Sequence, residues 1–404
     1  MISPEPRPAS DSNWQPTANE LSLLIVGASA RAAAASAVRA GFQPISLDAF
    51  ADLDTRRLGP TRQVTDYPAG LQSAMGGFAS APAMYVGGIE NSIGVIDQLT
   101  TQHQLWGNTR EEVLNARNPL LLNEVLKLAR APSCEWRNSD DPPPANGEWM
   151  LRPLAGSGGQ GILPWDEEAE RAVSAIGGLD IPYGFQQRIQ GAPYSAIFVA
   201  APQAGDVQFV GVTRQLVGDG AFGAARFQWC GNIGPVSLEM VVEHLIRRIG
   251  NILKWKAGLR GIFGIDFLLD DRGQPWVTEV NPRYPASTEL LEWATGECLL
   301  WDHARCFQVV GERPEWQGGD QSPYFGKAIV YAPRDVTVPE FTPEWAEVFH
   351  PWQFPQVADI PAPGTVVPAD APLVSIFSMG ASYALCYEKL VERAADVRAA
   401  FACD

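Results

Sequence analysis

Several features are scarce in this sequence, and each scarcity argues against a class of protein. The six cysteines form no CxxC pair, so neither a disulfide framework nor a zinc site is expected, and a reducing cytoplasm is the expected location. The four histidines are unclustered, which favours core or surface roles over a catalytic one. No apolar run reaches the about 18 residues that would span a bilayer. These residues are Cys134, Cys230, Cys298, Cys306, Cys386 and Cys403, and His103, His244, His303 and His350.

Positive charge is also in the minority. The sequence has 30 Lys and Arg against 46 Asp and Glu, which gives a net charge of −16. Such an acidic surface repels a phosphate backbone, so no nucleic-acid partner is expected, and any phosphate site must be locally basic. Residues 1–20 lack the basic-then-apolar pattern of an export signal, and their Pro, Ser and acidic residues predict a disordered tail.

The remaining composition, 46% hydrophobic and 19% charged, is that of a globular protein with several structural units. The apolar run Leu21–Val26 predicts a buried parallel strand, which Gly27 ends. Arg31–Ala40 is rich in Ala and predicts a helix, and a second strand ends at Asp48. This order predicts an α/β fold that begins with a Rossmann-like domain over residues 21–110.

Later segments alternate between helical and strand patterns. Apolar spacing predicts a helical stretch over residues 109–131, and the proline-rich residues 138–147 predict an exposed connector. Further helices are expected over residues 238–257 and 384–401. Short strands fill the rest, including a hairpin over residues 261–282, with its turn at 270–273.

A glycine-rich loop is the first candidate site. The segment LRPLAGSGGQGI, residues 151–162, places three glycines among four residues directly after a predicted strand. Glycines allow backbone amides to close around an anion, and Arg152 would meet that anion with positive charge. The alternative is a flexible surface hairpin, because the loop fits no GxxxxGK[ST] pattern. The loop residues concerned are Gly156, Ser157, Gly158, Gly159 and Gly161.

The predicted hairpin is the second candidate site. Asp266 lies among apolar residues, where a carboxylate is costly unless it is paired or binds a cation. Glu279 and Asn281 lie two residues apart on the next strand and so share a face that Asp266 can oppose. These oxygen donors suit magnesium, and Arg283 adds a bidentate phosphate donor. The alternative is a solvated face with one surface salt bridge.

The order of these motifs resembles the ATP-grasp superfamily of carboxylate–amine ligases. The resemblance covers about residues 21–310 and rests on the glycine-rich loop, then QQRI at 186–189, then Asp266 and the ExNPR run at 279–283. It implies two α+β lobes that clamp ATP beside a Rossmann-like domain, with amide formation through an acylphosphate. The implied units are residues 111–185 with a lid, residues 186–311 with the metal hairpin, and a β-rich C-terminal extension over residues 312–404.

The resemblance also implies roles for individual residues. Asp266, Glu279 and Asn281 would bind Mg²⁺, and Asn281 and Arg283 would act at the phosphate or acylphosphate. The loop from Gly156 to Gly161 would cover the phosphates of ATP together with Arg152. The hinge against adenine would be Gln186, Gln187, Arg188 and Ile189.

Two departures from the family pattern keep other functions open. Arg152 stands where the family usually has Lys, so the charge is kept but the shape is changed. Gln187 stands where the hinge usually carries an acid. A degenerate nucleotide-binding protein without ligase activity is therefore one alternative, and a carboxylase-like ATP-grasp enzyme is another.

The segments GASARAAA, GGIEN, QLWGN and VTRQLVG resemble one branch of the superfamily, linked to methanopterin and methanofuran one-carbon metabolism. In that branch a ligase joins tyramine to the γ-carboxylate of glutamate, so small-molecule carboxylate and amine partners are expected, and a homodimer is compatible with them. Ser29, Arg31, Glu90 and Asn91 follow predicted strands, where doubly wound sheets bind ligands. Arg31 would hold a carboxylate and Glu90 an amine. The alternative makes Arg31 a helix-surface residue with Ser29 as its N-cap.

Overall fold

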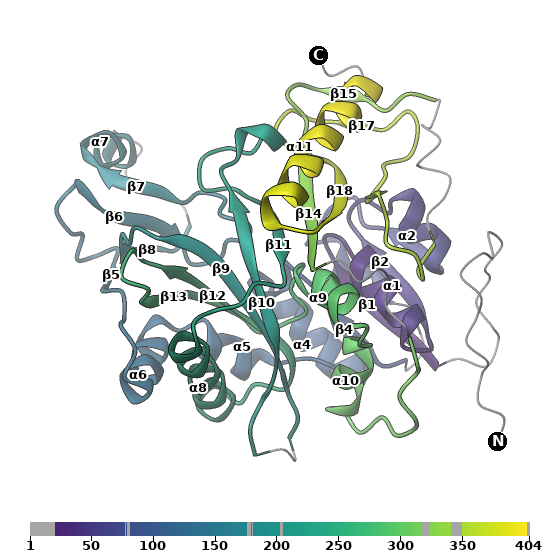
Figure 1. The fold of residues 1–404 in the computed structure, drawn as a ribbon, viewed down its shortest axis with the longest axis horizontal. Helices are drawn as coiled ribbons and strands as arrows, with labels where there is room; N and C mark the ends of the chain where they lie inside the picture. Colours follow the sequence, from purple (N-terminus) through teal and green to yellow (C-terminus); the bar gives the residue numbers. More distant parts are fainter. Residues whose placement is uncertain are drawn as a thin grey trace.

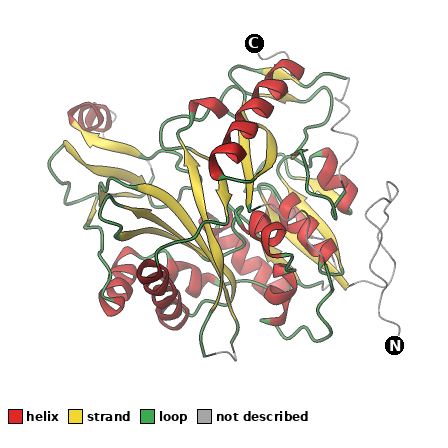
Figure 2. Ribbon diagram, in the orientation of Figure 1, coloured by secondary structure: helices red, strands yellow, loops and turns green. Residues whose placement is uncertain are grey.

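The computed structural model describes residues 21–401 apart from 77, 79–80, 176–178, 180, 203–204, 317–322 and 341–349. The predicted tail, residues 1–20, lies outside the described residues. The described chain forms a parallel sheet, a small outer sheet and a long central sheet, with helices on their faces (Figure 1; Figure 2). Within this part of the chain, every helix is too short or too polar to cross a membrane.

The N-terminal unit is a parallel sheet in the order β3-β2-β1-β4, as the βαβ pattern predicts. β1 and β2 pair along their whole length, and α1 connects them in sequence. The strands are β1 (Leu21–Gly27), β2 (Phe42–Asp48), β3 (Thr61–Gln63) and β4 (Ala83–Tyr85), and the helices are α1 (Arg31–Arg39), α2 (Leu53–Leu58), α3 (Leu71–Ala74), η1 (Ile89–Asn91) and α4 (Ile93–Gln102).

The helical stretch predicted over residues 109–131 is two helices, α5 (Arg110–Ala116) and α6 (Pro119–Ala129). Pro119 at the first position of α6 has no N–H to continue the preceding helix, and the Asn118 side chain accepts a hydrogen bond from Leu120 N at 2.9 Å. The predicted helical stretch is confirmed, and Pro119 marks where it divides into two helices.

A small antiparallel sheet carries the glycine-rich loop. Its order is β5-β8-β6-β7, and the loop joins β6 to β7. β8 continues to Gln187, so the unit boundary predicted between residues 185 and 186 falls inside a strand. The elements are β5 (Trp136–Asn138), β6 (Asn146–Pro153), β7 (Leu163–Asp166), α7 (Glu167–Ala175) and β8 (Tyr183–Gln187).

The central sheet has eight strands in the order β13-β12-β9-β10-β11-β14-β18-β16. Its last three strands come from the predicted C-terminal extension, which joins this sheet because β14 pairs with β11. A two-stranded ladder of β15 (Val336–Thr337) and β17 (Val366–Val367) lies beside it. The strands of the central sheet are β9 (Ala192–Ala200), β10 (Gln208–Val217), β11 (Trp229–Gly234), β12 (Gly261–Leu269), β13 (Pro275–Asn281), β14 (Tyr324–Tyr331), β16 (Val357–Ala358) and β18 (Pro372–Gly380).

Helices bury the faces of the central sheet and fix its position. α8 (Met240–Ala257) and α6 pack on one part of the sheet, where the rings of Phe198 and Phe263 stack at 5.1 Å. α11 (Tyr383–Ala400) packs on β14 and β18. α9 (Thr288–Thr295) and α10 (Leu299–Arg305) fill the space against α1. The helices predicted over residues 238–257 and 384–401 are thereby confirmed.

His303 links three parts of the fold and is expected to make stability depend on pH. Its Nδ1 accepts a hydrogen bond from Ile262 N at 2.9 Å, and Nε2 lies 3.1 Å from Trp106 O. Burial lowers the pKa of His303 from 6.5 to about 4, although the hydrogen bond to Trp106 O favours the charged ring. The contribution of neutral His303 to the unfolding free energy is fully present above pH 6.5 and is lost as pH falls through 4.

Wild type should therefore lose about 3 kcal/mol more unfolding free energy than His303→Asn between pH 7 and pH 4. Urea unfolding at both pH values measures the difference. The Asn side chain keeps an acceptor for Ile262 but does not titrate. Exposed His244→Asn is the matched control and should follow wild type. Identical pH dependence in wild type and His303→Asn would contradict the assignment.

Candidate active site

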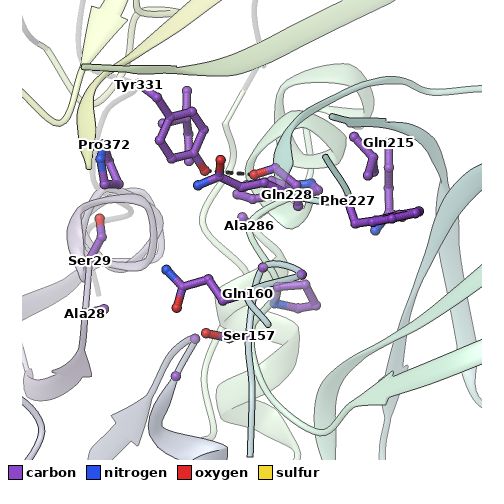
Figure 3. Close-up of a pocket in the computed structure, with 18 of the residues that line it drawn as sticks. Ala28, Ser29, Ser157, Gln160, Gln215, Phe227, Gln228, Ala286, Tyr331 and Pro372 are labelled. Carbon is purple, nitrogen blue, oxygen red and sulfur yellow. Dashed lines mark hydrogen bonds between the residues drawn. The ribbon is translucent and has the colours of Figure 1, made fainter. Parts of the chain in front are cut away.

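A cavity of about 1640 Å³ lies where the parallel sheet, the small sheet and the central sheet meet. Figure 3 shows Ser29, Ser157 and Gln160 around this space, with Tyr331 and Gln228 on another side. Most of the predicted site residues line it: Ser29, Asn91, Arg152, Ser157, Gly158, Gly159, Gln186, Gln187, Arg188, Ile189, Asp266, Glu279, Asn281 and Arg283. Arg31, Glu90, Gly156 and Gly161 do not line it.

The β12–β13 hairpin brings the predicted metal residues together. Asp266 lies directly opposite Glu279 in the antiparallel register, and Asn281 Nδ2 donates to Asp266 Oδ2 at 3.0 Å. The other Asp266 oxygen, Oδ1, is buried without a hydrogen-bond partner. Burial and the adjacent charge of Glu279 raise the pKa of Asp266 to about 6.

These oxygens fit a divalent cation. A bound cation would satisfy the orphaned Oδ1 of Asp266 and offset the repulsion between Asp266 and Glu279. Among the described residues no group of three or more His, Cys, Asp or Glu is arranged to hold a metal. The hairpin therefore supplies two carboxylates and the Asn281 amide, and phosphate oxygens and water would complete the shell. That incomplete, all-oxygen set is what magnesium accepts beside a nucleotide.

Arg283 connects this hairpin to the parallel sheet. Its Nε donates to Glu90 Oε1 at 3.0 Å, and its Nη2 donates to Asn281 Oδ1 at 3.1 Å. Glu90 is 4% exposed. Burial alone would raise the pKa of Glu90, but the charge of Arg283 holds it below its usual value. Glu90, predicted to hold an amine, instead positions Arg283 at the cavity wall.

Arg152 spans from β6 to the β12–β13 hairpin. Its Nη1 donates to Gln186 Oε1 at 2.6 Å and to Thr278 O at 3.0 Å, and its Nη2 lies 3.2 Å from Glu279 Oε2. The guanidinium fork therefore links the small sheet to β13 and contacts Glu279. A lysine ammonium is a single point of charge and lacks this fork.

The glycine-rich loop is closed over the cavity. Gly158 O accepts a hydrogen bond from Trp229 N at 3.0 Å, and Gly156 O accepts from Asn91 Nδ2 at 3.3 Å. Gly159 has φ 79°, and a Cβ there would overlap the Phe227 carbonyl. Asn91, predicted to bind substrate, therefore also holds the lid, and glycine permits the close approach.

The segment predicted as a hinge against adenine, residues 186–189, lines the cavity. Gln187 N donates to Glu135 O at 2.9 Å, and Gln187 Oε1 accepts from Glu135 N at 3.3 Å. This side chain thus pairs with a neighbouring strand rather than acting as an anion. Met150 and Leu268 also line the cavity and add apolar surface to its wall.

Arg31 lies behind the cavity, in a buried ion cluster. It is fully buried, and its guanidinium donates to both carboxylate oxygens of Glu289 and to Asp359 at 3.0 Å. Its donors are therefore directed away from a substrate carboxylate. Sequence reasoning missed Lys327 and Asp359, which do line the cavity. The single charge in the apolar strand YFGKAIVY was the available signal for Lys327.

The fold and the site define a two-lobed clamp, in which a lid hairpin on one sheet closes on a carboxylate hairpin of another, beside a parallel sheet. A family model described as an ATP-grasp domain matches residues 117–287, so this segment is an ATP-grasp domain. No curated protein gave a significant sequence match.

Solved structures share the architecture at low sequence identity. Pyruvate carboxylase from Rhizobium etli aligns with TM-score 0.68 and 12% identity over 93% of this chain, which spans only 37% of that protein. L-amino acid ligase from Bacillus licheniformis aligns with TM-score 0.65 and 15% identity, over 93% of this chain and 98% of that one. Carboxyaminoimidazole ribonucleotide synthase from Aspergillus clavatus, complexed with ATP, aligns with TM-score 0.65 and 12% identity, over 94% of this chain and 100% of that one. At these identities the likeness shows a shared fold.

Proposed function

We propose that this protein is an ATP- and magnesium-dependent, ADP-forming ligase that joins a carboxylate to an amine. The observation that carries the proposal is the arrangement of Asp266, Glu279, Asn281 and Arg283 on one cavity wall beneath a closed glycine-rich lid. Two structures with this fold support it, because one is an L-amino acid ligase and the other holds ATP.

The proposed reaction uses two displacements. A carboxylate oxygen attacks the γ-phosphorus of ATP, the β–γ bridge breaks and ADP leaves. The amine nitrogen then attacks the acyl carbon of the acylphosphate, phosphate leaves and the amide forms with loss of one proton. Asp266 and Glu279 would hold magnesium, which would neutralise charge on the phosphates. Arg283, held by Glu90, faces the transferred group, and the lid excludes water from it.

Within this class we extend the proposal to glutamate, or a related carboxylate, and tyramine, or a related cofactor-precursor amine, in one-carbon metabolism. The resemblance of the Ser29–Arg31 and Glu90–Asn91 segments to that branch supports this choice. We also propose a homodimer in the cytoplasm as the working assembly.

The test is ADP release with purified protein, ATP and magnesium against a panel of carboxylates and amines, with bicarbonate included. The expected result is release that needs both a carboxylate and an amine, with the amide found by mass spectrometry. Bicarbonate-dependent release without an amine would instead indicate a carboxylase-like enzyme. ATP binding without release under any pair would indicate a nucleotide-binding protein, and either result would overturn the ligase proposal.

Arg152→Ala should weaken ATP binding by roughly 10- to 150-fold, which is the range for a lost hydrogen bond to a charged group. Arg152→Lys should retain much of the affinity, although the two-pronged contact with Gln186 and Glu279 is lost. Calorimetry with ATP and magnesium measures all three proteins. Arg137→Ala, an exposed arginine on the same sheet, is the control. Equal affinity of Arg152→Ala and wild type would remove Arg152 from the nucleotide site.

A further inference from the structure

The end of the cavity beside the parallel sheet is unusually rich in carboxylates. Asp52, Asp359 and Lys327 line it, and further charged groups lie directly behind them. The two cations, Arg31 and Lys327, face more carboxylates than they can neutralise. The five carboxylates are those of Asp48, Asp52, Asp54, Glu289 and Asp359.

Four of these five carboxylates have partners. Asp48 accepts hydrogen bonds from the backbone N–H groups of Ala30, Phe50 and Ala51, and Asp54 accepts from the backbone N–H groups of Asp359 and Ile360. Glu289 pairs with Arg31 and with Lys327, whose Nζ lies 3.1 Å away, and Asp359 pairs with Arg31 and accepts from the Ser29 hydroxyl at 3.2 Å. These contacts use both cations of the cluster.

Asp52 is the exception. It is 5% exposed and lines the cavity, yet its carboxylate caps no N–H of α2 and has no hydrogen bond or ion pair within the described chain. A buried carboxylate without a partner is costly. Burial and the charge of Asp54 raise the pKa of Asp52 above its usual value. A cation arriving from the cavity would supply the missing partner.

We propose that this end of the cavity binds the positively charged group of an amine substrate, with Asp52 as its counter-ion. The inference rests on the proposed ligase function and names the class of amine that the site selects. Ala32, Ala33 and Phe50 also line this end and offer apolar contact to an alkyl or aryl chain. A zwitterionic amino acid is disfavoured, because its carboxylate would meet Asp52 and Asp359.

The test uses the full chain with ADP and magnesium, and four probes of equal chain length: n-butylamine, 1,4-diaminobutane, 4-aminobutanoate and 1-butanol. Ligand-detected NMR gives their affinities. The two cations are expected to bind at least about tenfold more tightly than the alcohol and the zwitterion. The monoamine and the diamine distinguish recognition of the reacting nitrogen from recognition of a second cationic group. Equal affinity for the cations and 1-butanol would overturn the proposal without any variant.

Asp52→Asn keeps the shape of the side chain and removes its charge. It should weaken the binding of both cations about tenfold or more, while the affinities for 1-butanol and ADP stay unchanged. Asp66→Asn removes an exposed carboxylate of the same unit outside the cavity and should change nothing. Unchanged cation affinity in Asp52→Asn would overturn the inference. Cation binding at Asp52 without ADP release from any carboxylate–amine pair would count only against the ligase function.

Discussion

Glu279→Gln is expected to lower ADP formation by at least about 100-fold, while the melting temperature stays close to that of wild type. Glutamine keeps the volume of the side chain but removes one of the two carboxylates opposed on the hairpin. Loss of a partner that merely orients a metal ligand costs 10- to 100-fold, so loss of a charged ligand should cost more. Steady-state ADP release across a magnesium titration measures the effect.

Asp271→Asn is the matched control, because Asp271 is an exposed carboxylate in the turn of the same hairpin. It should release ADP at the wild-type rate with the same magnesium dependence. If Glu279→Gln also keeps wild-type turnover and magnesium dependence, the hairpin does not hold the metal, and the proposed assignment of Asp266 and Asn281 is lost with it.

Arg283→Ala is expected to lose about 3–5 kcal/mol of unfolding free energy together with ligase activity, since it leaves Glu90 buried without its partner. The side chain of Glu90 is only 2% exposed, and Arg283 is 13% exposed. Urea unfolding measures the stability, and ADP release measures the activity.

The double variant Arg283→Met with Glu90→Gln separates the two effects. It removes both charges, so most of the lost stability should return, because the cost in Arg283→Ala comes from an uncompensated buried charge. Activity should not return, since the guanidinium that faces the proposed phosphate site is still absent. Recovery of turnover along with stability would show that Arg283 has a structural role only.

The sequence predicted the features whose parts are close along the chain. Asp266 and Glu279 belong to one hairpin, and the Asp270–Gly273 turn together with period-two alternation was enough to place them opposite each other. The lid and the first βαβ unit were predictable for the same reason, because turn residues and apolar runs mark each of them locally.

Features that join distant segments could not be predicted. The Arg283–Glu90 pair spans 193 positions, and the contact of Arg31 with Asp359 spans 328. No local pattern encodes such partners, since they depend on how the sheets pack. The same limit explains why residues 312–404 were predicted as an extension, although β14, β18 and β16 complete the central sheet.

That continuous sheet has a mechanical consequence. Asp266 on β12 and Lys327 on β14 belong to the same hydrogen-bonded sheet. Four strand-to-strand steps separate them, which is roughly 20 Å measured across the strands. The pairing of the strands between them therefore sets how far the Asp266 carboxylate lies from the Lys327 ammonium across the cavity.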